Sequence, residues 1–282
     1  MKFKTFYLLF YQHRFKKGSI LRKLYLSIIL PLKYIFNFFY FEKKINLDKF
    51  SKKNSYLFEK NLDFLFEFFN SDKGNKYINQ YMHPSKKNKI KIQAHGYSQF
   101  YENIFFKIKD KKLNIIELGS FYGNASAALY FYFKNSRIYG ADINPDMFRF
   151  ISDRVECFFV DSSSLLSIEN EIIKKKITFD IIIEDASHML KDQIISLFYL
   201  FPKLSQGGYF IIEELDFPET REDMRAGQQF PDLKTILLNI LDNKDFNSPY
   251  IDKNSKNYLL DNLDSIKIYK GNINEMAIIK KK

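Results

Sequence analysis

Residues 114–124 read NIIELGSFYGN, and this stretch decides the fold. Its first five residues predict a short apolar strand, and a helix is predicted from residue 125. Between them, Gly119 allows a sharp turn and Gly123 allows the chain to pass close to a ligand at the helix N-terminus. The turn lacks the middle glycine of a dinucleotide-binding fingerprint. Taken alone, it leaves a purely structural turn and a ligand-binding turn equally open.

From residue 114 onward, strands and helices alternate. Because the strands are apolar throughout, they predict a parallel sheet covered on both faces. The expected strands are 114–118, 137–141, 157–160, 179–183 and 209–212, with helices at 125–132 and 191–200. At the end of the chain, strands at 265–269 and 275–279 are joined by a Lys-Gly-Asn turn that predicts a hairpin. The fold class is therefore α/β, with a doubly wound, mostly parallel, seven-stranded sheet that ends in an antiparallel hairpin.

The segment before the sheet has its own pattern. Residues 61–70 predict a short amphipathic helix, and residues 85–91 a Lys/Asn-rich loop. The stretch from His95 to Glu102 then leads into a second helix that runs through Phe106. We therefore divide the chain into an N-terminal helical arm (1–60), a helical cap (61–110) and the sheet domain (111–282).

Composition excludes several classes of protein. With 282 residues and 46% hydrophobic content, the chain is not disordered or fibrous. Its single cysteine, Cys157, excludes a disulfide framework and a Cys-based zinc site. The net charge is +11, but residues 1–60 hold 14 Lys/Arg against 3 Asp/Glu, and the rest of the chain holds 30 of each. The balanced body argues against a nucleic acid partner.

The basic arm is also aromatic, and its most apolar stretch runs from Leu24 to Phe41. This stretch is short for a bilayer span and contains Pro31 and Lys33. Three interpretations stay open: packing against the body or a partner subunit, binding to an anionic membrane surface, and a transmembrane anchor. We favour a cytoplasmic protein, with peripheral membrane contact through residues 1–60 and homo-oligomerisation as open alternatives.

Two further strands of the sheet end in carboxylates. The second ends at Asp142, where a carboxylate can accept both ribose hydroxyls of a nucleoside, and the third is followed by Asp161 and Ser162, which suit an adenine edge. Here the chain resembles the class I S-adenosylmethionine-dependent methyltransferases, over about residues 110–280. The resemblance implies that Glu117, Gly119 and Gly123 hold the methionine end of the donor. Nicotinamide binding is the competing interpretation, and the missing glycine and the terminal hairpin disfavour it.

The fourth and fifth strands end in acidic residues, Asp185 after the fourth and Glu213 and Glu214 after the fifth. The ends of neighbouring strands lie about 5 Å apart, so these carboxylates are expected to converge and to repel one another unless a cation offsets them. Oxygen ligands suit Mg²⁺ or Mn²⁺. The alternative is that some of the three cap helices or point to solvent.

His188 follows Asp185 by three residues. Methylation of an alcohol requires removal of a weakly acidic proton, so a divalent metal and a neutral imidazole together suit an unactivated hydroxyl. We therefore predict His188 as the general base. Without the neighbouring metal and donor sites, a lone histidine would be a packed or surface residue.

This constellation resembles the metal-dependent sugar O-methyltransferases that act on deoxysugars of macrolide antibiotics. The resemblance rests on Asp185 with His188, on Glu213 with Glu214, on Ser71-Asp72-Lys73, and on His95, Tyr97, Tyr101 and Glu102. It implies that Asp185, Glu213 and Glu214 hold the metal, that His188 is the base, and that Asp72, Lys73 and Tyr97 belong to the methyl-donor site. The chain departs from the usual family pattern at Ala186 and at Glu214.

The expected function is therefore S-adenosylmethionine- and Mg²⁺-dependent O-methylation of a sugar hydroxyl, on a glycan, a lipid-linked saccharide or a glycosylated metabolite. Two alternatives remain open. One is a methyltransferase for a small aromatic hydroxyl, and the other is a non-catalytic S-adenosylmethionine-binding protein docked by its N-terminal arm.

Overall fold

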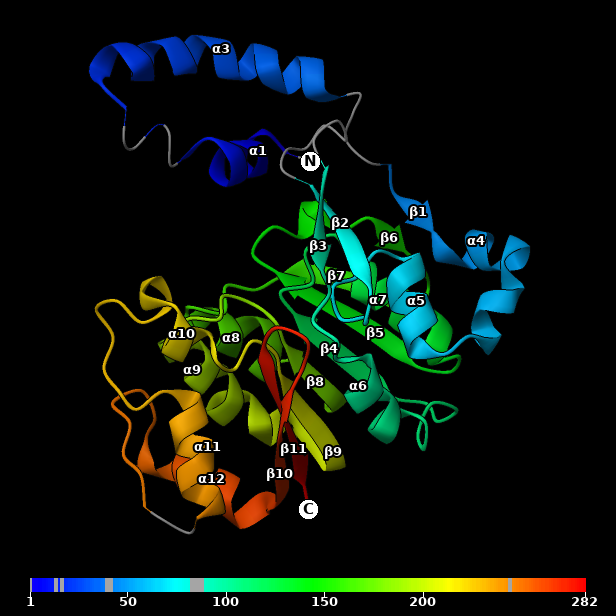
Figure 1. Ribbon diagram of the computed structural model, residues 1–282, viewed down its shortest axis with the longest axis vertical. Coiled ribbons are helices and arrows are strands. Elements are labelled where there is room, and N and C mark those ends of the chain that lie inside the picture. The colour runs from blue at the N-terminus through cyan, green and yellow to red at the C-terminus, as the bar shows by residue number, and fades with distance from the viewer. Residues whose placement is uncertain (1, 13–14, 16–17, 39–42, 82–88, 243–244) are drawn as a thin grey trace.

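The computed structural model describes residues 2–12, 15, 18–38, 43–81, 89–242 and 245–282 (Figure 1). Seven strands form its main sheet in the order β10-β11-β9-β8-β4-β5-β7. β9, β8, β4, β5 and β7 are parallel, and β11 is antiparallel to both β9 and β10. The predicted fold class is thereby confirmed. The strands are β4 (Asn114–Leu118), β5 (Arg137–Asp142), β7 (Val155–Phe159), β8 (Phe179–Glu184), β9 (Leu204–Ile212), β10 (Leu263–Lys270) and β11 (Glu275–Lys281).

Both faces of the sheet are covered because successive strand residues point to opposite sides. Ile115 and Ile183 face one hydrophobic core, and Ile116 and Ile182 face the other. Helices with residues in the first core are α4 (Leu47–Lys53), α5 (Leu62–Phe68), α6 (Ser98–Phe105) and α7 (Asn124–Tyr132). Those with residues in the second are α8 (Leu165–Ile168), α9 (Leu190–Leu200), α11 (Leu233–Leu241) and α12 (Lys253–Asn262).

Helix α7 has no polar face, since every residue from Ala125 to Tyr132 is buried. It contributes to the same core as β4 and β5 on the sheet side, and α5 and the 3₁₀ helix Ser55–Glu59 pack against it. The residues before the sheet domain therefore form an outer layer over α7, which holds the turn of residues 119–123 in place.

The cap contains a hairpin that the sequence analysis did not predict. β2 (Tyr77–Tyr81) and β3 (Lys89–Gln93) pair antiparallel. The expectation of a loop at 85–91 is wrong for residues 89–91, and residues 85–88 lie outside the described residues. The stretch KIKIQ alternates apolar and polar residues, as a half-exposed strand does, but its Lys-rich composition hid that pattern.

The N-terminal 60 residues fall into two parts. In the first, helices α1 (Phe3–Phe10) and α3 (Ile20–Phe38) pack together through a small core of Phe6, Tyr11, Leu26 and Leu30. This pair is tied to the body where the Asp146 carboxylate accepts hydrogen bonds from the backbone N–H of Lys2 (2.6 Å) and the hydroxyl of Thr5 (2.8 Å). No helix in the described part of the chain has the length and apolar character that a bilayer crossing requires.

In the second part, the chain packs against the body. β1 (Ile45–Asn46) pairs in parallel with β6 (Phe150–Ile151), and Leu47 and Leu57 are fully buried in the same hydrophobic core as the residues of α7. The division at residue 60 remains a prediction, and residues 45–59 share the core of the sheet domain.

This packing makes a stability prediction. Leu57→Ala should lower the free energy of unfolding by about 2–5 kcal/mol, because it leaves a cavity in the core. Tyr56→Ala, at a neighbouring side chain that is 49% exposed, should change it by less than about 1 kcal/mol. Denaturant unfolding of both variants measures the difference, and equal effects would contradict the shared core.

Candidate active site

The carboxyl ends of the parallel strands open into a cavity of about 580 Å³. Such an edge is where ligands bind in open α/β sheets, and this volume suits a small-molecule ligand. The predicted site residues that line the cavity are Asp72, Lys73, Glu117, Gly119, Asp142, Asp161, Ser162, Asp185 and His188. Gly123, Tyr97, Glu213 and Glu214 lie outside this lining. Of the three predicted metal ligands, only Asp185 lines the cavity together with the residues expected at the donor site.

The two glycines of the turn have different tasks. Both adopt positive φ, which favours glycine, and a Cβ on Gly119 would lie 1.9 Å from the carbonyl oxygen of Asp185. Because Gly119 has no Cβ, the turn of residues 119–123 packs directly against Asp185, the residue after β8. A Cβ on Gly123 would instead lie 2.5 Å from the ring of Phe148. Gly123 thus makes room for Phe148, and its expected approach to a ligand stays a prediction.

Asp142 is oriented by the turn opposite to it. One carboxylate oxygen accepts a hydrogen bond from the backbone N–H of Phe121 (2.8 Å) and the other from that of Asn144 (2.7 Å). Burial raises the pKa of Asp142, and these two hydrogen bonds act against that rise. Asp161 is held differently, since its Oδ1 atom accepts from the backbone N–H and the hydroxyl of Ser163. Both carboxylates are fixed at the cavity wall.

Two segments of the cap are joined above the sheet edge. The backbone N–H groups of His95, Gly96 and Tyr97 donate to the carbonyl oxygens of Asp72, Gly74 and Lys73, at 2.7, 2.8 and 3.0 Å respectively. The turn of the terminal hairpin joins them, because the N–H of Asn272 donates to the carbonyl of His95 (2.6 Å). Residues far apart in the sequence thus hold Lys73 and His95 over the ends of the strands.

The side chain of Lys73 enters the acidic cluster. It is 1% exposed, and its ammonium donates hydrogen bonds to Asp185 and to Glu213 (2.8 Å to the latter) and lies 3.5 Å from Glu117. These carboxylates come from the neighbouring strands β4, β8 and β9 or the residues that follow them. Burial would lower the pKa of Lys73, but the carboxylates raise it well above its ordinary value. The cation beside Asp185 and Glu213 in this structure is therefore an ammonium group.

The same ammonium affects the carboxylates unequally. Burial alone would raise the pKa of Asp185, but Lys73 holds it below the ordinary value. Burial raises the pKa of Glu117 to about 7, although Lys73 opposes that rise. Glu213 also accepts a hydrogen bond from the hydroxyl of buried Tyr101. Glu213 thus has two partners within the protein.

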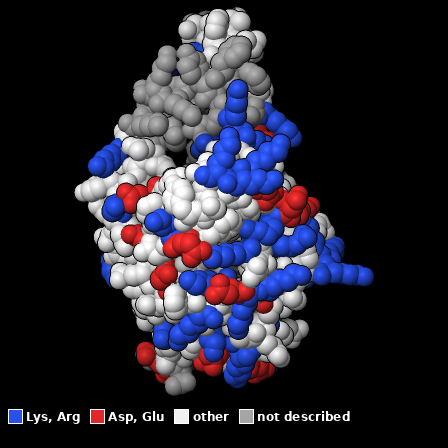
Figure 2. Space-filling model, turned by 90° about the vertical axis from the view of Figure 1, so that its right-hand side faces the viewer, with Lys and Arg blue, Asp and Glu red and all other residues white. Residues whose placement is uncertain are grey.

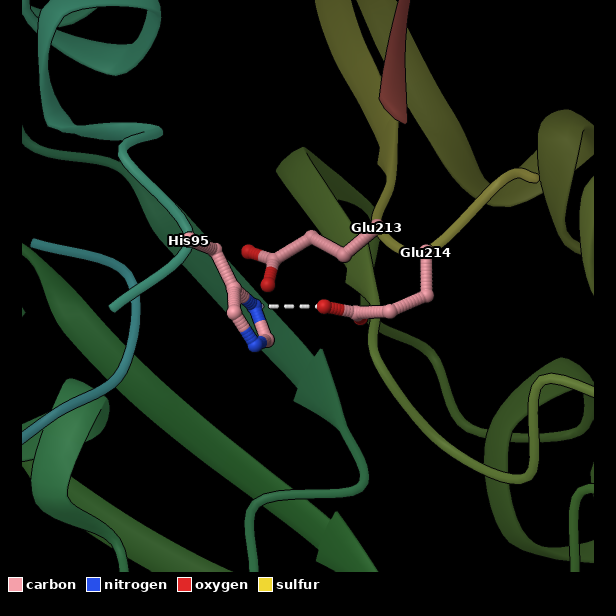
Figure 3. A group of neighbouring side chains, drawn as sticks. All are labelled: His95, Glu213 and Glu214. Carbon is pink, nitrogen blue, oxygen red and sulfur yellow. Dashed lines mark ion pairs between the residues drawn. The ribbon is translucent and has the colours of Figure 1, made fainter. Parts of the chain in front are cut away.

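Glu214 faces two histidines instead. Its Oε1 atom lies 2.5 Å from Nδ1 of His95, and its Oε2 atom lies 3.7 Å from Nδ1 of His188 (Figure 3). Figure 3 shows the imidazole of His95 pointing from the cap segment toward the carboxylates that follow β9. Burial would lower the pKa of His95, but Glu214 raises it to about 9. The Nε2 atom of His188 lies 3.7 Å from Asp185. His188 thus lies between Asp185, which follows β8, and Glu214, which follows β9.

Four buried polar atoms in this arrangement face one another as ion-pair partners: both carboxylate oxygens of Glu214 and the Nδ1 atoms of His95 and His188. In the described part of the chain, two groups bring possible ligand atoms within 4.8 Å of one another: His95, Glu213 and Glu214, and Asp185, His188 and Glu214. Carboxylate oxygens together with an imidazole nitrogen are donor types that fit a divalent cation. The predicted ligands Asp185 and Glu213 fall into different groups, and Glu214 belongs to both.

Backbone strain gathers at the same place. Among the described residues, the non-glycine positions with positive φ are Asn70, Phe121, His188 and Glu214. Three of them line the cavity, and Glu214 contacts His188. Such conformations cost on the order of 1 kcal/mol each and are concentrated at functional sites.

Some residues differ from expectation. Tyr97 is fully buried and donates a hydrogen bond to the backbone carbonyl of Glu275 (3.3 Å), so its predicted contact with the donor stays a prediction. The sequence analysis placed His95 in a motif but predicted no function for its side chain. Glu184 was not singled out, although it is fully buried and burial raises its pKa to about 8. In the sequence, Glu184 could have been identified by its position as the last residue of an apolar strand.

Comparisons with known proteins agree with this arrangement. No protein-family model matches the chain. Over 128 residues it is 29% identical to the 8-demethyl-8-alpha-L-rhamnosyl tetracenomycin-C 2'-O-methyltransferase of Streptomyces olivaceus. It is 27% identical to the 8-demethyl-8-(2-methoxy-alpha-L-rhamnosyl)-tetracenomycin-C 3'-O-methyltransferase of the same organism. Each match covers 43% of this chain, and 33% and 32% of the two relatives. The chain therefore matches about a third of the length of these relatives.

Among solved structures, the chain is similar to the MycE methyltransferase of the mycinamycin biosynthetic pathway, in complex with Mg, S-adenosylhomocysteine and mycinamycin VI. The TM-score is 0.58 at 18% identity, over 79% of this chain and 54% of MycE. At this identity the likeness concerns the fold. The chain has the fold of a class I methyltransferase, and in sequence it resembles sugar O-methyltransferases.

Proposed function

We propose that the protein is an S-adenosylmethionine-dependent O-methyltransferase that acts on a sugar hydroxyl, on a glycan, a lipid-linked saccharide or a glycosylated metabolite. The observation that carries this proposal is the position of His188. Its side chain lines the cavity shared with Asp142 and Gly119, and it lies 3.7 Å from both Asp185 and Glu214. The two curated relatives, named as rhamnosyl O-methyltransferases, support a sugar as the acceptor.

The donor is proposed to lie along the wall from Glu117 to Asp161. Asp142 already accepts one backbone hydrogen bond on each oxygen, and each oxygen has a second lone pair for a ribose hydroxyl. The sulfonium end would lie near Gly119, beside the carboxylates of Glu117 and Asp185. Those negative charges favour a positively charged sulfonium.

The transfer itself is a single displacement. The acceptor oxygen forms a bond to the methyl carbon while the bond from that carbon to sulfur breaks, and the hydroxyl proton passes to the imidazole of His188. The products are a methyl ether, S-adenosylhomocysteine and a protonated histidine. Asp185 and Glu214 flank that imidazole and stabilise its charged form.

A divalent metal, Mg²⁺ or Mn²⁺, is proposed to be held by Asp185 and Glu214, with Glu213 as a further predicted ligand. When bound, the ion lowers the pKa of the acceptor hydroxyl. Glu214 is the strongest candidate ligand, because it belongs to both groups of possible ligand atoms in the described part of the chain. The Mg²⁺ in the MycE complex supports this part of the proposal.

Lys73 is proposed to act as a fixed counter-charge for Asp185 and Glu213, alongside its predicted place in the donor site. Its loss should leave buried carboxylates unpaired. Lys73→Met should therefore lower the free energy of unfolding by about 3–5 kcal/mol, and adding Glu213→Gln should recover part of that loss. Lys76→Met, at a side chain that is 65% exposed, should cost less than about 1 kcal/mol. Denaturant unfolding tests this, and equal effects of the two substitutions would refute it.

Donor binding can be tested without an acceptor. Asp142→Asn should weaken S-adenosylhomocysteine binding about 10- to 100-fold, because a charged acceptor for the ribose hydroxyls becomes neutral. The matched control is Asp146→Asn, since Asp146 binds α1 and does not line the cavity. Isothermal titration calorimetry measures both. No binding to the unmutated chain would overturn the proposed function.

Catalysis needs an acceptor panel of saccharides, with transfer of a labelled methyl group as the readout. His188→Ala should reduce turnover about 100-fold or more while S-adenosylhomocysteine still binds, because the base is removed and the donor wall is intact. Chelation of divalent ions should abolish transfer, and Mg²⁺ or Mn²⁺ should restore it. Full activity of His188→Ala would exclude His188 as the base, and activity in excess chelator would exclude the metal.

A further inference from the structure

Helix α3 presents an apolar face that no described part of the chain covers. Its exposed side chains recur every three or four residues, so they share one side of the helix. They are between 48% and 80% exposed: Ile20, Leu21, Leu24, Tyr25, Ile28, Leu32, Ile35 and Phe36. Leu26 and Leu30, on the opposite side, are buried against α1. The apolar face therefore points away from α1, and α3 is the outermost element in Figure 1.

Basic residues accompany this face. Residues 1–41 contain eight Lys/Arg and no Asp/Glu. Arg22 and Lys33, three helical turns apart, lie along one edge of the apolar face, next to Tyr25 and Phe36. In Figure 2 the uppermost described atoms, at the height of α3 in Figure 1, are mainly white, and Lys and Arg gather on the face below them.

We propose that α3 docks the protein in the interfacial plane of an anionic lipid membrane, with its apolar face among the acyl chains and its basic edge at the headgroups. An amphipathic helix with large apolar side chains and Lys/Arg at the margin has the features of such interfacial helices. Anionic headgroups attract each nearby Lys or Arg. The proposal does not depend on the methyltransferase function.

Electrostatic repulsion makes a second copy of the chain a less favourable partner for the apolar face of α3. Two arms placed face to face would bring two segments with eight basic and no acidic residues together. The body from residue 61 onward has 30 basic and 30 acidic residues, so it offers no excess negative charge to the arm. An anionic membrane supplies both the apolar phase and the opposite charge.

The test is cosedimentation of the full chain with vesicles of phosphatidylcholine alone and of phosphatidylcholine with 30% phosphatidylserine. Leu21→Asp/Leu24→Asp should weaken binding to the mixed vesicles at least about tenfold, because charges enter the apolar face. The matched control is Leu238→Asp/Leu241→Asp, which has the same spacing on α11, at leucines that are 44% and 47% exposed. This control should leave vesicle binding unchanged.

Arg22→Gln/Lys33→Gln separates charge from apolar insertion. It should reduce binding to the mixed vesicles about tenfold and change binding to phosphatidylcholine little. Three outcomes would overturn the proposal: no binding of the unmutated chain to the mixed vesicles, equal losses in the α3 and α11 leucine variants, or a vesicle-free dimer that Leu21→Asp/Leu24→Asp converts to a monomer. Circular dichroism and thermal unfolding confirm that each variant is folded.

Discussion

One ammonium group lies among three carboxylates at the ends of three neighbouring strands. Glu117, Asp185 and Glu213 extend from the β4, β8 and β9 region of a single sheet edge, and Lys73 contacts all three. Without it, buried negative charges would be crowded together at the spacing of adjacent strands, which is costly in a low-dielectric interior. The acidic edge of the sheet therefore depends on a residue that is not part of the sheet.

That dependence explains why the cap is built as it is. The backbone of Lys73 is held over the strand ends because its carbonyl accepts a hydrogen bond from the N–H of Tyr97. Tyr97 belongs to the same segment as His95. The hairpin between β10 and β11 closes over the same place through Asn272. Both the cap and the end of the chain thus fix the position of one charge. The strained backbone at His188 and Glu214 is held by the same surroundings, since both side chains lie within this cluster.

Much of this arrangement could be predicted from the sequence. Apolar strands with two buried faces gave the parallel sheet, and the position of a residue at a strand end was enough to bring Asp142, Asp161 and Asp185 to one cavity. The sequence could not predict which side-chain atoms contact one another. The contact of Gly123 with Phe148 and the contacts of Lys73 depend on tertiary packing between segments far apart in the chain. The amphipathic strand at Lys89–Gln93 was missed because its composition resembles that of a loop.

The division of partners among the carboxylates has a consequence for metal binding. Lys73 is covalently part of the chain and buried, so its charge cannot dissociate from Asp185 and Glu213 as an ion can. Glu213 is further held by Tyr101, whereas Glu214 has the imidazoles of His95 and His188 as ion-pair partners. The cluster therefore has one side held by an ammonium group and one side that faces titratable imidazoles. On that second side, His188 lines the cavity and lies 3.7 Å from both Asp185 and Glu214, so this is the side at which an exchangeable ion is proposed.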